Sequence, residues 1–270
     1  MFARANGPRT TAPSTLAPAA DMKRIEMLGP MGAGKSALVE AIRRHAAKRL
    51  PLQTAAEAKT ALLVAEAGRR SPLHEVALRL LSQHRATNAA FVTDKITASA
   101  WSALEARSHD FYPLLHYVLR QRSGDLGQPA RALRRTYWFI RDVTDVALFE
   151  ERRPAGFVLH DESLLQRGLA FGFGEADAQA QVERYMELAP LPAAVLHVTA
   201  PADMLAKRVA RRDRDLGRHL CHIEQAFELS MHASASLRRR GVCVIELDGL
   251  DDLEANVRHA LHALRGELGP

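Results

Sequence analysis

The residues with the clearest chemistry form the stretch GPMGAGKS, from Gly29 to Ser36, which matches the pattern GxxxxGK[ST] at every fixed position. Glycines let a backbone curl so that successive N–H groups point inward, and such a nest binds phosphate oxygens. A helix that begins near Lys35 adds the positive end of its dipole. In this pattern the lysine reaches the β- and γ-phosphates and the serine hydroxyl ligates Mg²⁺. The stretch therefore predicts a site for a nucleoside triphosphate with magnesium.

The predicted nucleotide contacts extend one residue past this stretch. They are Gly29, Pro30, Met31, Gly32, Ala33, Gly34, Lys35, Ser36 and Ala37. A short apolar strand is predicted before the loop, and a segment that is apolar at helical spacing follows it, which is the context that the pattern requires. The loop identifies a ligand but not a reaction, so the other motifs must indicate what happens to the triphosphate.

A carboxylate that could hold the metal follows the apolar stretch FVLHD, which predicts a buried strand ending at Asp161. Ligands of an open α/β sheet bind at the carboxyl ends of its strands. Asp161 at that edge can hold Mg²⁺ directly or through water, together with Ser36. Asp248 also ends an apolar strand, but Asp248-Gly249 is typical of a turn, so we favour Asp161.

Three arginines, Arg208, Arg211 and Arg212, follow another predicted strand, AAVLHVTA at 193–200. Spacings of three and four residues place them on one face of a helix. Arginines beside a phosphate site can neutralise the charge that builds up on a transferring phosphoryl group. The alternative is a solvated basic helix face, but the position after a predicted core strand favours a catalytic role.

Other classes of nucleotide-binding protein lack support. The sequence has no [NT]KxD motif for guanine and no LSGGQ motif of an ABC ATPase. A sulfotransferase-like protein also uses a phosphate loop, but the complete GK[ST] favours a triphosphate.

In their order, GPMGAGKS, FVLHDES and the basic helix ending in ARRDR resemble the P-loop kinases of the nucleoside monophosphate kinase and deoxynucleoside kinase group, thymidylate kinase-like proteins included. The resemblance implies an α/β, three-layer P-loop NTPase fold with a five-stranded parallel sheet in the order 2-3-1-4-5. It implies ATP as phosphate donor and Mg²⁺ as cofactor. It also implies that Lys35, Ser36 and Asp161 are site residues, and that the basic helix belongs to a lid that excludes water.

The same resemblance suggests a base and leaves the acceptor open. Glu66, at the end of a strand predicted for TALLVAE (60–66), resembles the acid that deoxynucleoside kinases use as a base. However, Glu162 stands where those kinases typically have an arginine, and their second-strand signature with a proline is absent. The acceptor of the γ-phosphate could then be a nucleoside, a nucleotide or another small molecule. Either Glu66 or Asp161 could orient or deprotonate an acceptor hydroxyl.

Strands that alternate with helices predict a parallel sheet covered on both faces. The five strands are expected near 24–28, 60–66, 156–161, 193–199 and 242–247, and AAFVTD at 89–94 is a weaker candidate. We expect one kinase domain at 22–270, with a helical insertion for the acceptor at about 70–153 and the lid at about 203–220. Residues 1–21 are rich in Ala, Pro and Thr and predict a disordered extension.

The composition indicates the class of protein, its possible partners and its cellular compartment. The 270 residues are 47% hydrophobic and carry a net charge of +6, as expected for a globular domain with a mild preference for anionic partners. Two cysteines without CxxC spacing predict neither a disulfide framework nor a zinc cluster and fit a reducing cytoplasm. No apolar stretch approaches 18 residues, so we expect no membrane partner. The oligomeric state stays open, with a homodimer as one option.

Two rival functions remain from the sequence. Arg131, Arg134, Arg135 and Arg141 surround Tyr137-Trp138-Phe139. Such interleaving can bind single-stranded nucleic acid, so the enzyme could be a polynucleotide kinase acting on RNA or DNA ends. We favour an amphipathic helix with Tyr137 and Ile140 in the core and the arginines outside. The second rival is a nucleotide-dependent regulatory ATPase with a protein partner.

Overall fold

The computed structural model describes residues 22–46, 50–73, 76, 98–123, 129–173, 177–212 and 222–269. Its centre is a sheet of five parallel strands in the order β2-β3-β1-β4-β5. The strands are β1 (Lys23–Leu28), β2 (Leu52–Thr54), β3 (Phe157–His160), β4 (Ala194–Thr199) and β5 (Cys243–Asp248). This sheet confirms the predicted fold class and strand order.

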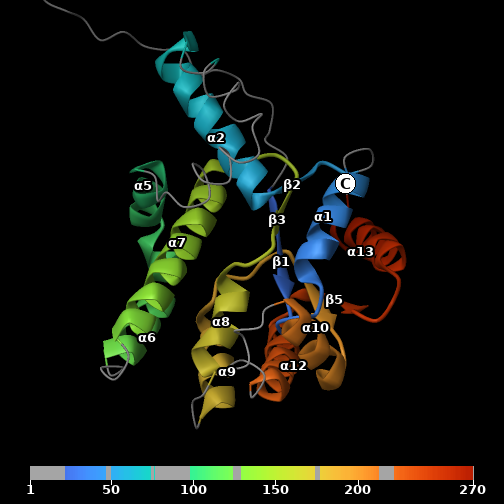
Figure 1. Cartoon of the computed structure of the whole chain (residues 1–270). Helices are drawn as coiled ribbons and strands as arrows, with labels where there is room; N and C mark the ends of the chain where they lie inside the picture. The colour runs from blue at the N-terminus through green and yellow to red at the C-terminus, as the bar shows by residue number, and fades with distance from the viewer. Residues whose placement is uncertain are drawn as a thin grey trace, which may run out of the picture.

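Helices cover both faces of the sheet (Figure 1). One core lies between the sheet and three helices, α1 (Lys35–Ala46), α10 (Ala202–Arg212) and α13 (Leu253–Leu268). A second core lies against the other face and is built by α6 (Ser108–Ser123), α7 (Pro129–Arg152), α8 (Leu164–Gly172), α9 (Ala178–Leu188) and α12 (Ile223–Arg239). Leu104 of α5 (Ala98–Ala106) also belongs to the second core, and α2 (Ala55–Arg70) is the remaining helix of the described ranges. Within the described ranges, none of these helices combines the length and apolar character needed to cross a membrane.

The middle strand β1 alternates between the two cores and carries a buried ion pair on the second face. Ile25 and Met27 belong to the first core, while Arg24 pairs with Glu26 on the opposite side. Burial raises the pKa of Glu26, although the charge of Arg24 acts against this. The other carboxylate oxygen of Glu26 accepts the backbone N–H of Leu165 at 3.0 Å, in the first turn of α8. Glu26 of this ion pair thus anchors the start of α8 to the middle strand of the sheet.

The strand predicted for 60–66 is wrong, because these residues lie inside α2. Thr54 caps α2, and its side chain and backbone exchange hydrogen bonds with Glu57, which is a capping box. The second strand is the shorter segment Leu52–Thr54, held by the bond from the backbone N–H of Phe157 to the carbonyl of Pro51 at 2.8 Å. The apolar run at 60–66 is too short for its periodicity to distinguish a strand from a buried helix. The cap at Thr54 favours the helix.

The helical segment between the second and third strands therefore begins at Ala55 and includes α2, α5, α6 and α7. The insertion predicted at about 70–153 is the later part of it. The candidate strand at 89–94 and the extension at 1–21 lie outside the described residues.

His160, the last residue of β3, makes stability depend on pH. Its side chain is 4% exposed and contacts the ring of Phe149, and burial, with the charge of Arg24, lowers its pKa to about 3. Below pH 6.5 the unfolded chain takes up a proton that the folded chain does not accept until about pH 3, so stability is lost as the pH falls through this window.

We expect the free energy of unfolding to fall by about 2 kcal/mol more between pH 7 and pH 5 in the wild type than in His160→Leu. Urea denaturation of both proteins at the two pH values measures this difference. Equal pH dependence in the two proteins would show that His160 is not held neutral.

Candidate active site

The loop between β1 and α1 adopts a conformation that requires its glycines. Gly29, Gly32 and Gly34 have φ angles of 146°, 85° and 104°, in the region that glycine favours. A Cβ atom on Gly29 would lie 2.1 Å from the carbonyl oxygen of Val198, so the backbone packs directly on β4. At Gly34 a Cβ atom would meet nothing within 4 Å. The loop is therefore closely packed behind Gly29 and open in front of Gly34, as a phosphate cradle must be.

Lys35 places its ammonium group inside this loop. The side chain is 8% exposed, and its Nζ donates hydrogen bonds to the carbonyls of Gly29 at 2.8 Å and Pro30 at 3.0 Å. Ser36 and Ala37 are exposed in the first turn of α1, which carries no acidic residue. The N–H groups of this turn, its dipole and the lysine all favour an anion at the same place. These residues fit the phosphates of a nucleotide.

The two candidate metal carboxylates differ in their surroundings. Asp161 follows β3, whose last residue, His160, pairs in register with Glu26 of β1. Asp161 therefore lies near the carboxyl ends of the strands, where the phosphate loop follows β1. The carboxylate of Asp248 instead accepts the N–H of Leu250 at 2.8 Å, within the turn that follows β5. The turn predicted at Asp248 is confirmed. The preference for Asp161 as a metal ligand stays a prediction.

The arginines predicted for the lid have separate positions. Arg208 on α10 donates hydrogen bonds to the carbonyl of Gly249 at 2.8 Å and, more weakly at 3.4 Å, to that of Gly32. It thus joins the phosphate loop to the turn after β5. Arg211 is exposed. The side chain of Arg212 and residues 213–221 lie outside the described part of the chain.

Glu66 does not lie at the end of a strand, because it belongs to α2. Its carboxylate accepts a hydrogen bond from the hydroxyl of Ser99 on α5. Figure 1 shows α2 leading from β2 away from the end of the sheet where α8 and α10 lie. The observation that suggested Glu66 as a base is therefore removed, and Asp161 is left as the candidate base.

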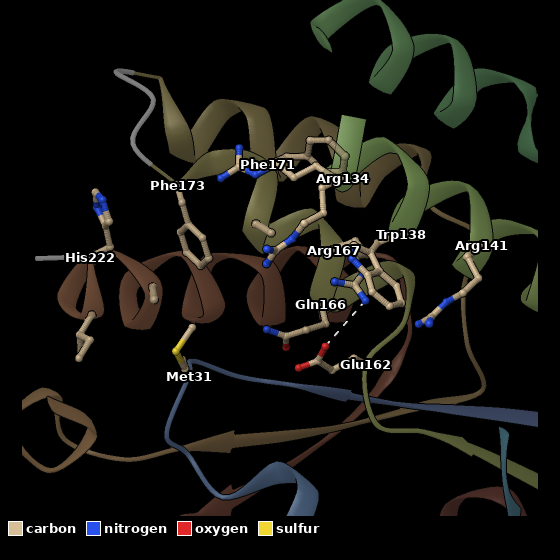
Figure 2. A pocket seen from close by; sticks show the side chains of 14 residues that line it. Met31, Arg134, Trp138, Arg141, Glu162, Gln166, Arg167, Phe171, Phe173 and His222 are labelled. Atoms are coloured by element: carbon tan, nitrogen blue, oxygen red, sulfur yellow. Dashed lines mark ion pairs between the residues drawn. The ribbon is translucent and has the colours of Figure 1, made fainter. Parts of the chain in front are cut away.

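A cavity of about 610 Å³ opens beside the phosphate loop (Figure 2). This volume is in the range of sites for small molecules. Met31 of the loop forms part of its wall, and the rest comes from α7, from α8 with the residues at either end of it, and from the start of α12. The lining includes Trp138, Glu162, Arg167, Phe171 and His222. The α7 wall comes from the predicted insertion, whereas α8 and α12 were not predicted to take part.

The basic and aromatic residues of α7 correct one expectation from the sequence. Tyr137 is 43% exposed, and Phe139 is the fully buried ring of this segment. Trp138 lines the cavity together with Arg134 and Arg141. These three residues recur at intervals of four and three positions, which is one face of a helix. This spacing was a signal for a polar, ligand-binding face, but the sequence did not show which helices would lie opposite.

A buried carboxylate organises the arginines of this wall. Asp142 is 4% exposed and contacts Arg167 Nε at 2.6 Å and Arg141 Nη2 at 3.2 Å. Burial raises the pKa of Asp142, while the charges of the two arginines oppose this. The guanidinium carbons of Arg141 and Arg167 lie 4.1 and 5.6 Å from the ring centre of Trp138, within the range of cation–π contacts. Glu162 lies 3.7 Å from Arg167 at the rim.

No protein-family model matches this chain, and no curated protein matches it either. Among solved structures, deoxyadenosine kinase from M. mycoides with bound dATP is 12% identical, with a TM-score of 0.45, and the match covers 90% of this chain and 99% of that chain. The same enzyme with bound dCTP gives 11% identity and a TM-score of 0.43, with the same coverage. This likeness is too distant to assign a function, which must rest on the residues of the chain itself.

Proposed function

We propose that this protein is a kinase that transfers the γ-phosphoryl group of Mg-ATP to a small molecule bound in the cavity. The observation that carries this proposal is the position of Met31, which belongs to the phosphate loop and also forms part of the cavity wall. A phosphate site and a cavity for a small molecule thus share a boundary. Transfer requires such proximity, because the acceptor oxygen must approach the γ-phosphorus in line.

Each residue has a defined task in this proposal. The loop amides and Lys35 hold the β- and γ-phosphates, and Ser36 and Asp161 hold Mg²⁺. The metal ion supplies neutralisation of phosphate charge when bound. An acceptor oxygen forms a bond to the γ-phosphorus while the bond from that phosphorus to the β–γ bridging oxygen breaks, releasing ADP. If the acceptor is a hydroxyl, Asp161 accepts its proton. The task proposed for Arg211 and Arg212 is to neutralise the charge on the transferring group, as their positions in the sequence predicted.

One observation favours the alternative of a polynucleotide kinase. The arginines and Trp138 of α7, which could bind a nucleic acid strand, line the cavity. The volume of this cavity, about 610 Å³, is in the range of sites for small molecules. We therefore favour a small acceptor.

A substrate screen with [γ-³²P]ATP tests the proposal. Nucleosides, nucleotides, sugars, sugar phosphates and RNA and DNA oligonucleotides are incubated with the full chain and separated by thin-layer chromatography. We expect one class of small molecule to become labelled. Label on oligonucleotides would favour the polynucleotide kinase. Release of inorganic phosphate alone, stimulated by a protein partner, would favour the regulatory ATPase.

A further inference from the structure

The cavity wall formed by α7 and α8 is strongly cationic. Its described lining contains four arginines and one carboxylate, namely Arg134, Arg135 and Arg141 of α7, Arg167 of α8 and Glu162. Asp142 lies beneath the wall and compensates Arg141 and Arg167 in part. Among the described residues that line the cavity itself, arginines thus outnumber carboxylates by four to one. Low-dielectric walls lined by one sign of charge focus that field on a ligand.

This charge is also held in a fixed arrangement. The buried carboxylate of Asp142 contacts both Arg141 and Arg167, and both guanidiniums lie near the ring of Trp138. Asp142 thus holds the two guanidiniums side by side at the cavity wall. Guanidinium groups recognise phosphate and carboxylate with paired hydrogen bonds. An anionic acceptor would gain more from these donors than a neutral one, because hydrogen bonds between ionised groups are the stronger ones.

The arginines lie at the opposite side of the cavity from the phosphate loop, where the γ-phosphate would react. Figure 2 shows Met31 on one side of the cavity, and Trp138 and Arg141 on the other. The γ-phosphate would bind by the loop, near Met31. The apolar rings of Phe171 and Phe173 also line the cavity.

On the basis of the proposed function, we propose that the acceptor carries an anionic group, a phosphate or a carboxylate, that binds to the arginines of α7 and α8. Its reacting oxygen then lies at the Met31 end, and its apolar or ring portion contacts Trp138 and Phe171. The anionic group lies away from the γ-phosphate, which reduces the repulsion between the two substrates. The sequence left the acceptor class open, and this arrangement narrows it to anions.

Trp138 allows a test that needs neither ATP nor phosphoryl transfer. The chain has two tryptophans, and Trp101 on α5 is 45% exposed. In full-length Trp101→Phe, the fluorescence of Trp138 is followed while phenyl phosphate, benzoate or benzyl alcohol is added. We expect a saturable change with at least one anion, at a Kd at least tenfold below that of the neutral alcohol. The stronger of the two anions identifies the group as phosphate or carboxylate.

Variants in the same background locate the binding. Arg134 is exposed at the surface of α7, so Arg134→Ala should fold, and it should raise the Kd of the anion at least fivefold. Arg184→Ala is the matched control, since Arg184 is exposed on α9 and pairs with Glu187. Lys35→Ala removes the phosphate loop as a competing anion site and should leave the fluorescence change intact. Circular dichroism confirms that each variant is folded.

Several results would overturn the inference. These are equal Kd values for the anions and the alcohol, no response from Trp138, or a response that Lys35→Ala abolishes and Arg134→Ala retains. Anion binding at Trp138 without labelled products in the screen would count against the proposed function alone. If the screen yields labelled products but the KM is lower for neutral acceptors than for matched anionic ones, the result would contradict only the proposal of an anionic acceptor.

Discussion

Lys35→Ala should lower phosphoryl transfer by at least about 100-fold at saturating acceptor, as expected for the loss of a preorganised charge at the transferring group. The ammonium of Lys35 is held inside the loop by the carbonyls of Gly29 and Pro30, at the place proposed for the phosphates. The affinity for Mg-ATP should fall as well, because in the proposed site the lysine would contact the phosphates both before and during transfer. Initial rates with [γ-³²P]ATP and calorimetric titration with Mg-ATP measure the two effects.

The matched control for this substitution is Lys207→Ala. Lys207 lies on α10, is exposed, and pairs with Asp203 four residues earlier at 3.0 Å. Its removal should leave the rate within about twofold of the wild type, since exposed ion pairs contribute little. Thermal unfolding of both variants establishes that they are folded. A rate for Lys35→Ala within tenfold of the wild type would refute the role of the loop in transfer.

Asp161→Asn should reduce transfer by about 100-fold and raise the Mg²⁺ concentration needed for half-maximal rate. The substitution keeps the size of the side chain and removes the negative charge that a hard cation prefers. It also removes the candidate base, so for a hydroxyl acceptor the rate should stay low even at saturating Mg²⁺. The dependence of the initial rate on Mg²⁺ concentration separates the two contributions.

Asp248→Asn provides the comparison at the other strand end. Its side-chain oxygen accepts the N–H of Leu250, and the amide oxygen of asparagine can do the same. The variant should therefore retain both its rate and its Mg²⁺ dependence. If Asp248→Asn loses activity while Asp161→Asn keeps it, the metal site belongs to the last strand.

The parts of the fold that the sequence predicted are those set by local signals. The glycines and Lys35 fix the loop whatever surrounds them, and the apolar runs of β1, β3, β4 and β5 are long enough to be recognised. β2 has three residues, too few to show alternation, and the apolar run at 60–66 suited either a strand or a helix. The capping box of Thr54 and Glu57 was the local signal that could have decided for the helix.

The cavity could be predicted only in part, because its walls are distant in the sequence. The face of α7 with Arg134, Trp138 and Arg141 was visible as a spacing, but a spacing does not distinguish a solvated face from a ligand wall. The distinction comes from α8 and α12, which bring Arg167 and Phe171 of the one helix and Ile223 of the other to the same cavity. Their placement depends on long-range contacts, such as the bond from the N–H of Leu165 to Glu26.

The hydrogen bonds of Arg208 have a mechanical consequence. One side chain of α10 contacts two backbone oxygens, at Gly32 and at Gly249, so that helix cannot rotate without pulling on both loops. A displacement of α10 would therefore be transmitted to the loop at Gly32 and to the turn at Gly249, and a change in either loop would in turn bias the orientation of α10.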